Sequence, residues 1–266
     1  MAEAAIRYWH ALTAADIDRL AESDPVVVLL LAAVEQHGPH LPLSTDLDIG
    51  LGLLAVAFDR LPATFPVVAL PPQAVGASRE HARYPGTLSL PPALLGDLIH
   101  HQGSAVARCG VRRLVVVNSH GGNRATLDAA GLRLREEERL LVVKVNYPDF
   151  PRPAAVDLPD SEWRHGLHGG AVETAMMRYL HPDRVREAES GVAASFAAEL
   201  EREGSRIAPE GAAAFAWLAG DLHPDGAVGD ATLGTADVGR RLVDYYGATL
   251  AAVIRDARSF PIERLT

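Results

Sequence analysis

A buried strand that runs straight into a polar segment is the feature that most constrains this chain. Residues Val26–Val34 are apolar without alternation, which is typical of a strand covered on both faces of a parallel sheet. Glu35 and His37 follow at once, and strand side chains repeat every second residue, so both project to one side. Because α/β sheets keep their ligand sites at the carboxyl ends of strands, we expect a metal site here.

Strands and helices alternate through the rest of the chain. Apolar strands are predicted at Val67–Leu70, Leu114–Asn118 and Leu141–Asn146. Helices are predicted between and after them, at Ile49–Leu61, Pro91–Cys109, Arg124–Glu137 and Arg240–Arg258. This order favours an α/β fold, a layered and mostly parallel sheet flanked by helices. With no internal repeat or shift in composition, residues 1–266 are predicted to form one domain.

Four further segments carry weaker patterns. The stretch that begins at Asp149 is Pro-rich and is predicted as a long loop before a helix. Ala193–Glu203 and Ala212–Leu218 are rich in alanine and are predicted to be helical. A glycine-rich turn from Gly226 is expected to lead into the last helix, with Thr235 or Asp237 near its start.

Composition excludes several kinds of partner. A formal net charge of -9 without a basic cluster argues against nucleic acid. The longest apolar run is far shorter than the roughly 20 residues of a membrane-spanning helix, and no secretory signal is apparent. A single cysteine, Cys109, cannot form an intrachain disulfide and is expected to be a small core residue. We therefore expect a soluble cytoplasmic protein.

The candidate metal ligands are carboxylates and imidazoles at strand ends. Glu35 and His37 are joined by Asp46, whose two oxygens could bridge two ions about 3.5 to 4 Å apart. Asp48 is expected instead to favour a helix N-terminus. His120 follows another strand beside two glycines, which leave it room to project into a site. Two divalent ions of zinc, manganese or iron would accept this mixture of ligands.

The remaining candidates lie beyond the first motif. Glu173 is expected to be a metal ligand that takes part in catalysis, and His168 an acid or base, with His165 as its rival. His40, Glu80 and His81 could either orient the ligands or contact the substrate. The predicted substrate-binding residues are Ser78, Glu80, His81, Gly121, Trp163 and His165.

Several of these motifs together resemble the creatininase (creatinine amidohydrolase) family. The specific ones are EQHGPHLPLSTD at Glu35–Asp46 and VNSHGGN at Val117–Asn123. Supporting motifs spread the resemblance over nearly the whole length: GASREHARYPGTLSL, HGGAVET and GAVGDATLGTADVG. The resemblance implies an α/β layered fold, a two-metal centre, hydrolysis of an amide C–N bond of a small-molecule substrate and, commonly, a homohexamer. It also implies Glu35, His37, Asp46 and His120 as ligands.

The chain departs from creatininase itself at one ligand position. Creatininase has a glutamate two residues beyond the ligand histidine, where this chain has Gly122, so Glu173 is the best replacement. That departure resembles the HGGN branch, which includes formamidopyrimidine deformylases and a mycofactocin precursor peptidase. The tryptophan associated with closing over creatinine is displaced too, since Trp163 lies five residues before His168.

The expected function is metal-dependent hydrolysis of a small or non-peptide amide, of the creatinine type, through a water activated at two metal ions. A formamide deformylase or a peptidase of the same family is the alternative. A non-catalytic metal-binding module is the alternative from another class. Nucleophilic serine catalysis fits poorly because the chain has no GxSxG motif.

Overall fold

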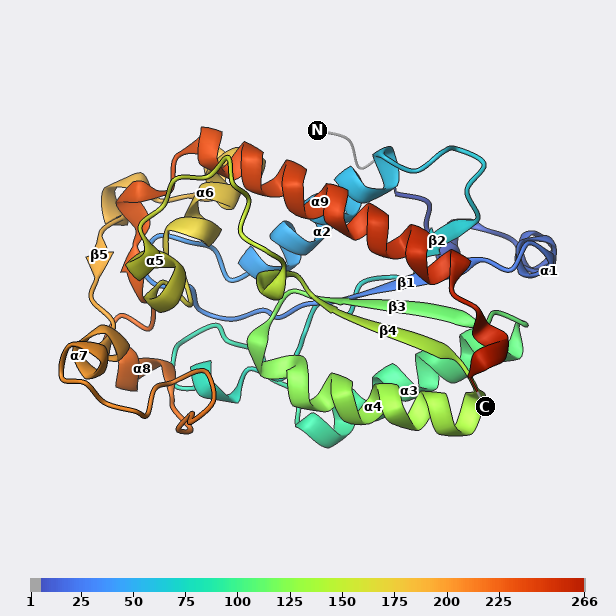
Figure 1. Cartoon of the computed structure of the whole chain (residues 1–266), viewed down its shortest axis with the longest axis horizontal. Coiled ribbons are helices and arrows are strands. Elements are labelled where there is room, and N and C mark those ends of the chain that lie inside the picture. Colours follow the sequence, from blue (N-terminus) through green and yellow to red (C-terminus); the bar gives the residue numbers. More distant parts are fainter. Residues whose placement is uncertain (1–5, 266) are drawn as a thin grey trace.

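The computed structural model describes residues 6–265 and is built on a parallel four-stranded sheet of order β2-β1-β3-β4 (Figure 1). The strands are β1 (Val26–Leu31), β2 (Val67–Ala69), β3 (Arg113–Asn118) and β4 (Leu141–Asn146). Helices cover both faces: α2 (Thr45–Asp59) and α9 (Ala236–Ser259) on one, α3 (Pro92–Arg108) and α4 (Arg124–Glu138) on the other (Figure 1). The predicted α/β layered fold is confirmed.

The position of β1 in the centre of the sheet explains why apolar and polar residues do not alternate along it. Val26, Val28 and Leu30 pack into the core cluster that contains residues of α2 and α9. The residues between them pack into the cluster on the side of α3 and α4. All six residues of the strand are buried, so either face requires apolar side chains.

Several boundaries differ from the prediction: α9 begins at Ala236 rather than Arg240, and the helix expected at Ala193–Glu203 covers only Phe196–Arg202. Two further differences bear on the metal ligands. β1 ends at Leu31, three residues earlier than expected, although the chain stays paired with its neighbours through a bridge between Val34 and Leu88. α2 begins at Thr45 rather than Ile49. Asp46 and Asp48 therefore lie in the first turn of a helix, where its dipole favours acidic side chains.

Smaller elements gather at the end of the sheet where the strands finish (Figure 1). They include α6 (Ala171–Leu180), which packs against α2 and α9. The others are α5 (Asp160–His165), α7 (Phe196–Arg202), α8 (Ala219–Leu222) and the antiparallel pair β5 (Val192–Ala193) and β6 (Gly229–Asp230). At the opposite end α1 (Ala14–Glu22) starts with a capping box between Thr13 and Asp16.

Three expectations were wrong. Ala212–Leu218 is not helical; alanine propensity is weak, and tertiary contacts override it in this stretch, which lines a cavity described below. The long Pro-rich loop is interrupted by α5, which carries Trp163 and His165. Cys109 is exposed at the C-terminal end of α3 instead of lying in the core. Thr235 and Asp237, of which one or the other was expected near the start of α9, both lie there: Thr235 is the N-cap, and Asp237 lies in the first turn.

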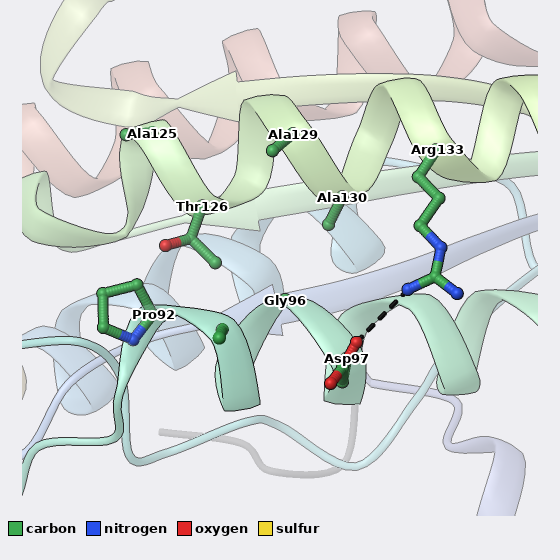
Figure 2. Close-up of a pocket in the computed structure, with 9 residues that line it drawn as sticks. Pro92, Gly96, Asp97, Ala125, Thr126, Ala129, Ala130 and Arg133 are labelled. Atoms are coloured by element: carbon green, nitrogen blue, oxygen red, sulfur yellow. Dashed lines mark hydrogen bonds and ion pairs between the residues drawn. The ribbon is translucent and has the colours of Figure 1, made fainter.

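A groove runs between α3 and α4, on the face of the sheet away from α2 and α9. Its cavity of about 440 Å³ is lined mainly by small side chains, such as Ala93, Gly96 and Ala129, and the ion pair between Arg133 and Asp97 crosses it (Figure 2). Its lining contains no histidine or cysteine. Among residues 6–265, no helix is both long and apolar enough to traverse a lipid bilayer.

Candidate metal centre

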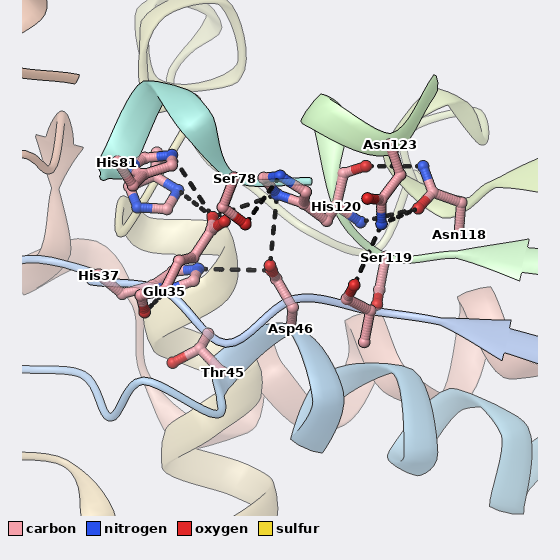
Figure 3. A network of polar contacts seen from close by, with 12 residues as sticks. Glu35, His37, Thr45, Asp46, Ser78, His81, Asn118, Ser119, His120 and Asn123 are labelled. Atoms are coloured by element: carbon pink, nitrogen blue, oxygen red, sulfur yellow. Dashed lines mark hydrogen bonds and ion pairs between the residues drawn. The ribbon is translucent and has the colours of Figure 1, made fainter. Parts of the chain in front are cut away.

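The predicted ligands converge beyond the carboxyl ends of β1 and β3. Glu35 and His37 come from the segment after β1, His120 from the turn after β3, and Asp46 from the first turn of α2 (Figure 3). Glu173 reaches the same place from the first turn of α6. Ligand atoms that lie within 4.8 Å of one another form three groups: Glu35, Asp46 and His120; His37, Asp46 and Glu173; and Glu35, His37 and His168.

Asp46 is shared by two of these groups. Its Oδ1 lies 3.4 Å from Nε2 of His37, and its Oδ2 lies 3.5 Å from Nδ1 of His120 (Figure 3). Glu35 completes the group on the His120 side, with Oε1 3.1 Å from that same Nδ1. Glu173 completes the other, with Oε2 3.8 Å from Nε2 of His37. The carboxylate of Asp46 thus lies between two groups of candidate ligand atoms.

Backbone contacts decide which nitrogen each imidazole offers to the site. Nδ1 of His37 donates to the carbonyl of Glu35 (3.1 Å), and Nε2 of His120 donates to the carbonyl of Ala77 (3.1 Å). Nε2 of His168 donates to the carbonyl of Gln36 (2.7 Å). In its neutral form each ring therefore turns a nitrogen lone pair inward, which is the arrangement that metal-ligating histidines adopt.

Buried atoms without hydrogen bonds show that a cation fits here. Within residues 6–265, both carboxylate oxygens of Glu35, Nε2 of His37 and Oδ2 of Asp46 are buried and have no hydrogen-bond partner. In each group the candidate ligand atoms lie within 4.8 Å of one another. An unpaired buried polar atom costs about 1–3 kcal/mol, and a carboxylate more. A divalent cation compensates several of these atoms at once.

The charges at the site act on one another strongly. Burial disfavours the charged form of His37, yet the neighbouring Asp46 raises its pKa to about 9. His120 is buried as well, and Glu35 raises its pKa well above the usual value. Burial raises the pKa of Glu173 to about 7, and burial beside Glu35 raises the pKa of Asp46. A negative field that stabilises positive imidazoles also attracts metal cations.

Three of the predicted substrate contacts lie against ligands. Oγ of Ser78, which is fully buried, lies 3.4 Å from Nε2 of His120, and Oε1 of Glu80 lies 3.3 Å from the same nitrogen. Nε2 of His81 lies 3.4 Å from Oε1 of Glu35. His40 lies farther out and bonds through Nε2 to Oγ1 of Thr174 (2.8 Å).

The other three divide between the cavity and the surface. Gly121 and Trp163 line the cavity over the ligands, together with Glu80, His81 and His168. His165 is not among the lining residues; its ring lies 2.8 Å from Glu201, an exposed residue of α7. The structure therefore favours His168 over His165 as the ring that faces the ligands.

Sequence reasoning did not single out Gln36. It lies between two candidate ligands in the sequence, and its side-chain amide contacts His81 and His168 of the site. Its amide nitrogen donates to the carbonyl of Gly226 (2.7 Å) and contacts Nδ1 of His81 (2.7 Å). Gln36 thereby ties the segment after β1 to the glycine-rich turn before β6.

Glu162 of α5 was missed too. Its carboxylate accepts from the backbone nitrogens of Ala171 (2.6 Å) and Asp230 (2.9 Å), which joins α5, α6 and β6. A side chain at Gly166, Gly170 or Gly229 would collide with it. The sequence alone does not point to Glu162, because the three glycines surround it only once the chain is folded.

The cavity above the ligands has a volume of about 650 Å³. Its lining includes five aromatic side chains: Tyr147 after β4, Trp163 of α5, Tyr246 of α9, and Phe215 and Trp217 from the segment expected to be a helix. No pattern in the sequence pointed to Phe215 and Trp217, because they reach the site only through the path of the chain between α7 and α8.

The fold and the site define an α/β protein with a buried carboxylate and imidazole centre of the kind found in metal-dependent hydrolases. Residues 10–254 match the family model Creatininase, described as creatinine amidohydrolase. The chain belongs to the creatininase family, whose named relatives are hydrolases of amide C–N bonds.

Two relatives and one solved structure show which kinds of enzyme this chain resembles. The mycofactocin precursor peptide peptidase of Mycolicibacterium smegmatis is 34% identical over 220 residues, which are 82% of this chain and 79% of that protein. Creatinine amidohydrolase of Pseudomonas putida is 32% identical over 63% of this chain and 68% of its own. A crystal structure of creatinine amidohydrolase (creatininase) has a TM-score of 0.77 at 25% identity, covering 96% of this chain and 98% of the other.

Proposed function

We propose that this protein hydrolyses a peptide-type amide bond at a centre of two divalent metal ions. The observation that carries the proposal is Asp46, whose two oxygens face His37 and His120 separately (3.4 and 3.5 Å). Glu35, Asp46 and His120 would hold one ion, and His37, Asp46 and Glu173 the other. One creatininase of the same fold is described as a manganese form. Zinc and iron suit these ligands equally well.

When bound, the two ions would supply a nucleophile from water at neutral pH and polarise the substrate carbonyl. The chain's own residues supply the proton transfer. His168 keeps its one N–H on the carbonyl of Gln36 (2.7 Å), so Nδ1 carries a lone pair on the side of Glu35. That nitrogen can accept the proton that the attacking water releases and return it to the departing nitrogen.

The size and lining of the cavity favour a substrate larger than one small ring. At about 650 Å³ it falls in the range that encloses ligands of drug size, and Trp163, Phe215 and Trp217 offer apolar walls for a side chain beside the amide. Similarity points the same way. The mycofactocin precursor peptide peptidase aligns with 82% of this chain, against 63% for creatinine amidohydrolase.

A small amide of the creatinine type is the second candidate, and a formamide is the third. A matching relative is named as a formylaminopyrimidine deformylase of Methanocaldococcus infernus, 24% identical over 70% of this chain. The motif Glu35–Asp46 fits all three substrates, because its carboxylates and histidine would hold the ions whichever amide is bound.

The test is a panel assay on the purified protein. After loading with zinc or manganese, the protein is incubated with short peptides, N-formyl compounds and creatinine, and the ions are counted by elemental analysis. We expect two ions per chain and hydrolysis of peptides, which a chelator abolishes and added metal restores. Two bound ions without hydrolysis of any amide would support a metal-binding module instead.

A further inference from the structure

We infer that Glu80 is a positioning residue for the metal ligand His120 and occupies the space that a side chain at position 122 would need. The inference concerns residues and contacts around the proposed centre and rests on that centre binding metal. It starts from the second glycine of the HGGN motif.

Gly122 lies against Glu80 and His120. A Cβ placed on Gly122 would lie 2.5 Å from Nε2 of His120 and would overlap Oε1 of Glu80 and the carbonyl oxygen of Ala77. The neighbouring Gly121 differs, since within the described chain no atom lies within 4 Å of the position of its Cβ. Only the second glycine is therefore required by packing.

The carboxylate that fills this space comes from a different segment. Glu80 belongs to a short 3₁₀ helix, Arg79–His81, and its Oε1 lies 3.3 Å from Nε2 of His120. On the opposite edge of the ring, Nδ1 faces Glu35 and Asp46 (3.1 and 3.5 Å). The His120 ring thus lies between the proposed ion position and the carboxylate of Glu80. A carboxylate on the outer nitrogen orients a metal-ligating histidine and makes its inner nitrogen more basic.

Asn123, the last residue of the motif, holds the two segments together. Its Oδ1 accepts from the backbone nitrogen of Ala77 (2.8 Å), and its Nδ2 donates to the carbonyl of Ala32 (3.1 Å) and to Oδ1 of Asn118 (3.1 Å). Asn123 is fully buried. The loop that carries Glu80 is therefore fixed to the turn that carries His120.

Two other acceptors compete for the same N–H of His120. The carbonyl of Ala77 lies 3.1 Å from Nε2, nearer than Glu80, and Oγ of Ser78 lies 3.4 Å away. These neutral groups can hold the orientation of the ring. They do not supply the negative charge of Glu80. Neutralising that charge should therefore weaken metal binding, and removing the whole side chain should weaken it more.

The experiment measures metal affinity in two variants of the full chain, Glu80→Gln and Glu80→Ala. Each is titrated with Zn²⁺ or Mn²⁺ against a chelating dye. For Glu80→Ala we expect one of the two ions to bind about 10 to 100 times more weakly, with the other unchanged. Glu80→Gln should fall between Glu80→Ala and the natural protein, because an amide oxygen still accepts a hydrogen bond. Excess metal should restore the kcat of both variants.

Matched variants keep the test independent of general damage. Glu210→Gln removes another acid of the same cavity and should leave both metal affinities unchanged. Gly122→Ala should weaken metal binding, while Gly121→Ala should retain it, since only the former meets Glu80 and Ala77. Thermal unfolding checks that each variant is folded, and the glutamate variants remain informative if Gly122→Ala is not.

The outcomes separate this inference from the function on which it rests. If Glu80→Ala binds both ions as tightly as the natural protein but has a raised KM, Glu80 contacts substrate and the inference is overturned. A natural protein that retains no ion after loading would remove the metal centre itself and the proposed function with it.

Discussion

Asp46 faces two histidines from one carboxylate, with Oδ1 3.4 Å from Nε2 of His37 and Oδ2 3.5 Å from Nδ1 of His120. The two rings come from segments more than 80 residues apart in the chain, so the relationship exists only in the folded protein. Asp46 itself is held by the first turn of α2, a rigid element, and its side chain is buried. It is the residue on which both proposed ion positions depend.

Replacing Asp46 with asparagine tests the bridge. One oxygen becomes an NH₂ group, which repels a cation, so we expect most of the metal and nearly all activity to be lost. Asp48→Asn is the control from the same helical turn, because Asp48 bonds to Ser44 and Arg184 and should keep the metal. Elemental analysis that finds two ions retained in Asp46→Asn would rule out the bridge.

Replacing His168 with glutamine separates proton transfer from metal binding. Glutamine can still donate to the carbonyl of Gln36 but has no basic nitrogen, so kcat should fall by about 10² to 10⁴ while two ions stay bound. His165→Gln should change kcat little, because His165 is paired with Glu201 outside the cavity. Loss of an ion in His168→Gln would instead assign this histidine as a ligand, as its group with Glu35 and His37 permits.

The lowered pKa of His40 should make the stability of the fold depend on pH. Burial and the charge of Arg178 lower the pKa of His40 to about 4. The unfolded chain, with its His pKa near 6.5, therefore binds more protons than the folded chain between pH 6.5 and 4. The free energy of unfolding should fall as pH decreases through this window, by up to about 1.4 kcal/mol per pH unit.

The measurement compares the melting temperature of the natural protein with that of His40→Gln from pH 7 to pH 4, both treated with a chelator. Glutamine does not titrate, so the difference between the two proteins isolates His40 from the acids that also protonate. Parallel curves for the two proteins would contradict the prediction.

A side chain at Gly239, far from the candidate ligands, should destabilise the fold. A Cβ there would overlap the carbonyl of Ala175, where α9 crosses α6. Gly239→Ala should therefore lower the free energy of unfolding by about 1–3 kcal/mol, measured by denaturant titration. Gly191→Ala serves as a reference, because nothing in the described structure lies within 4 Å of its Cβ position. Equal stability of the two variants would show that α6 and α9 can separate.

Much of the centre was predictable from local patterns. Glu35 and His37 share a side because extended chain alternates, and Asp46 and His120 were expected nearby because parallel strands end at one edge of the sheet. The parallel sheet followed from strands that alternate with helices. The single domain, the homohexamer and the cytoplasmic location stay predictions.

What the sequence by itself determined is the set of groups and the edge of the sheet where they meet, because periodicity and strand ends depend on near neighbours in the chain. Only the tertiary structure decided that Glu80 fills the space beside Gly122, that Glu162 lies among three glycines, and that Phe215 and Trp217 line the cavity that contains the candidate ligands. The contacts of Glu80 with Gly122 and of Glu162 with Gly229 join residues tens of positions apart. Their partners are chosen by packing of the whole chain, which no local pattern records.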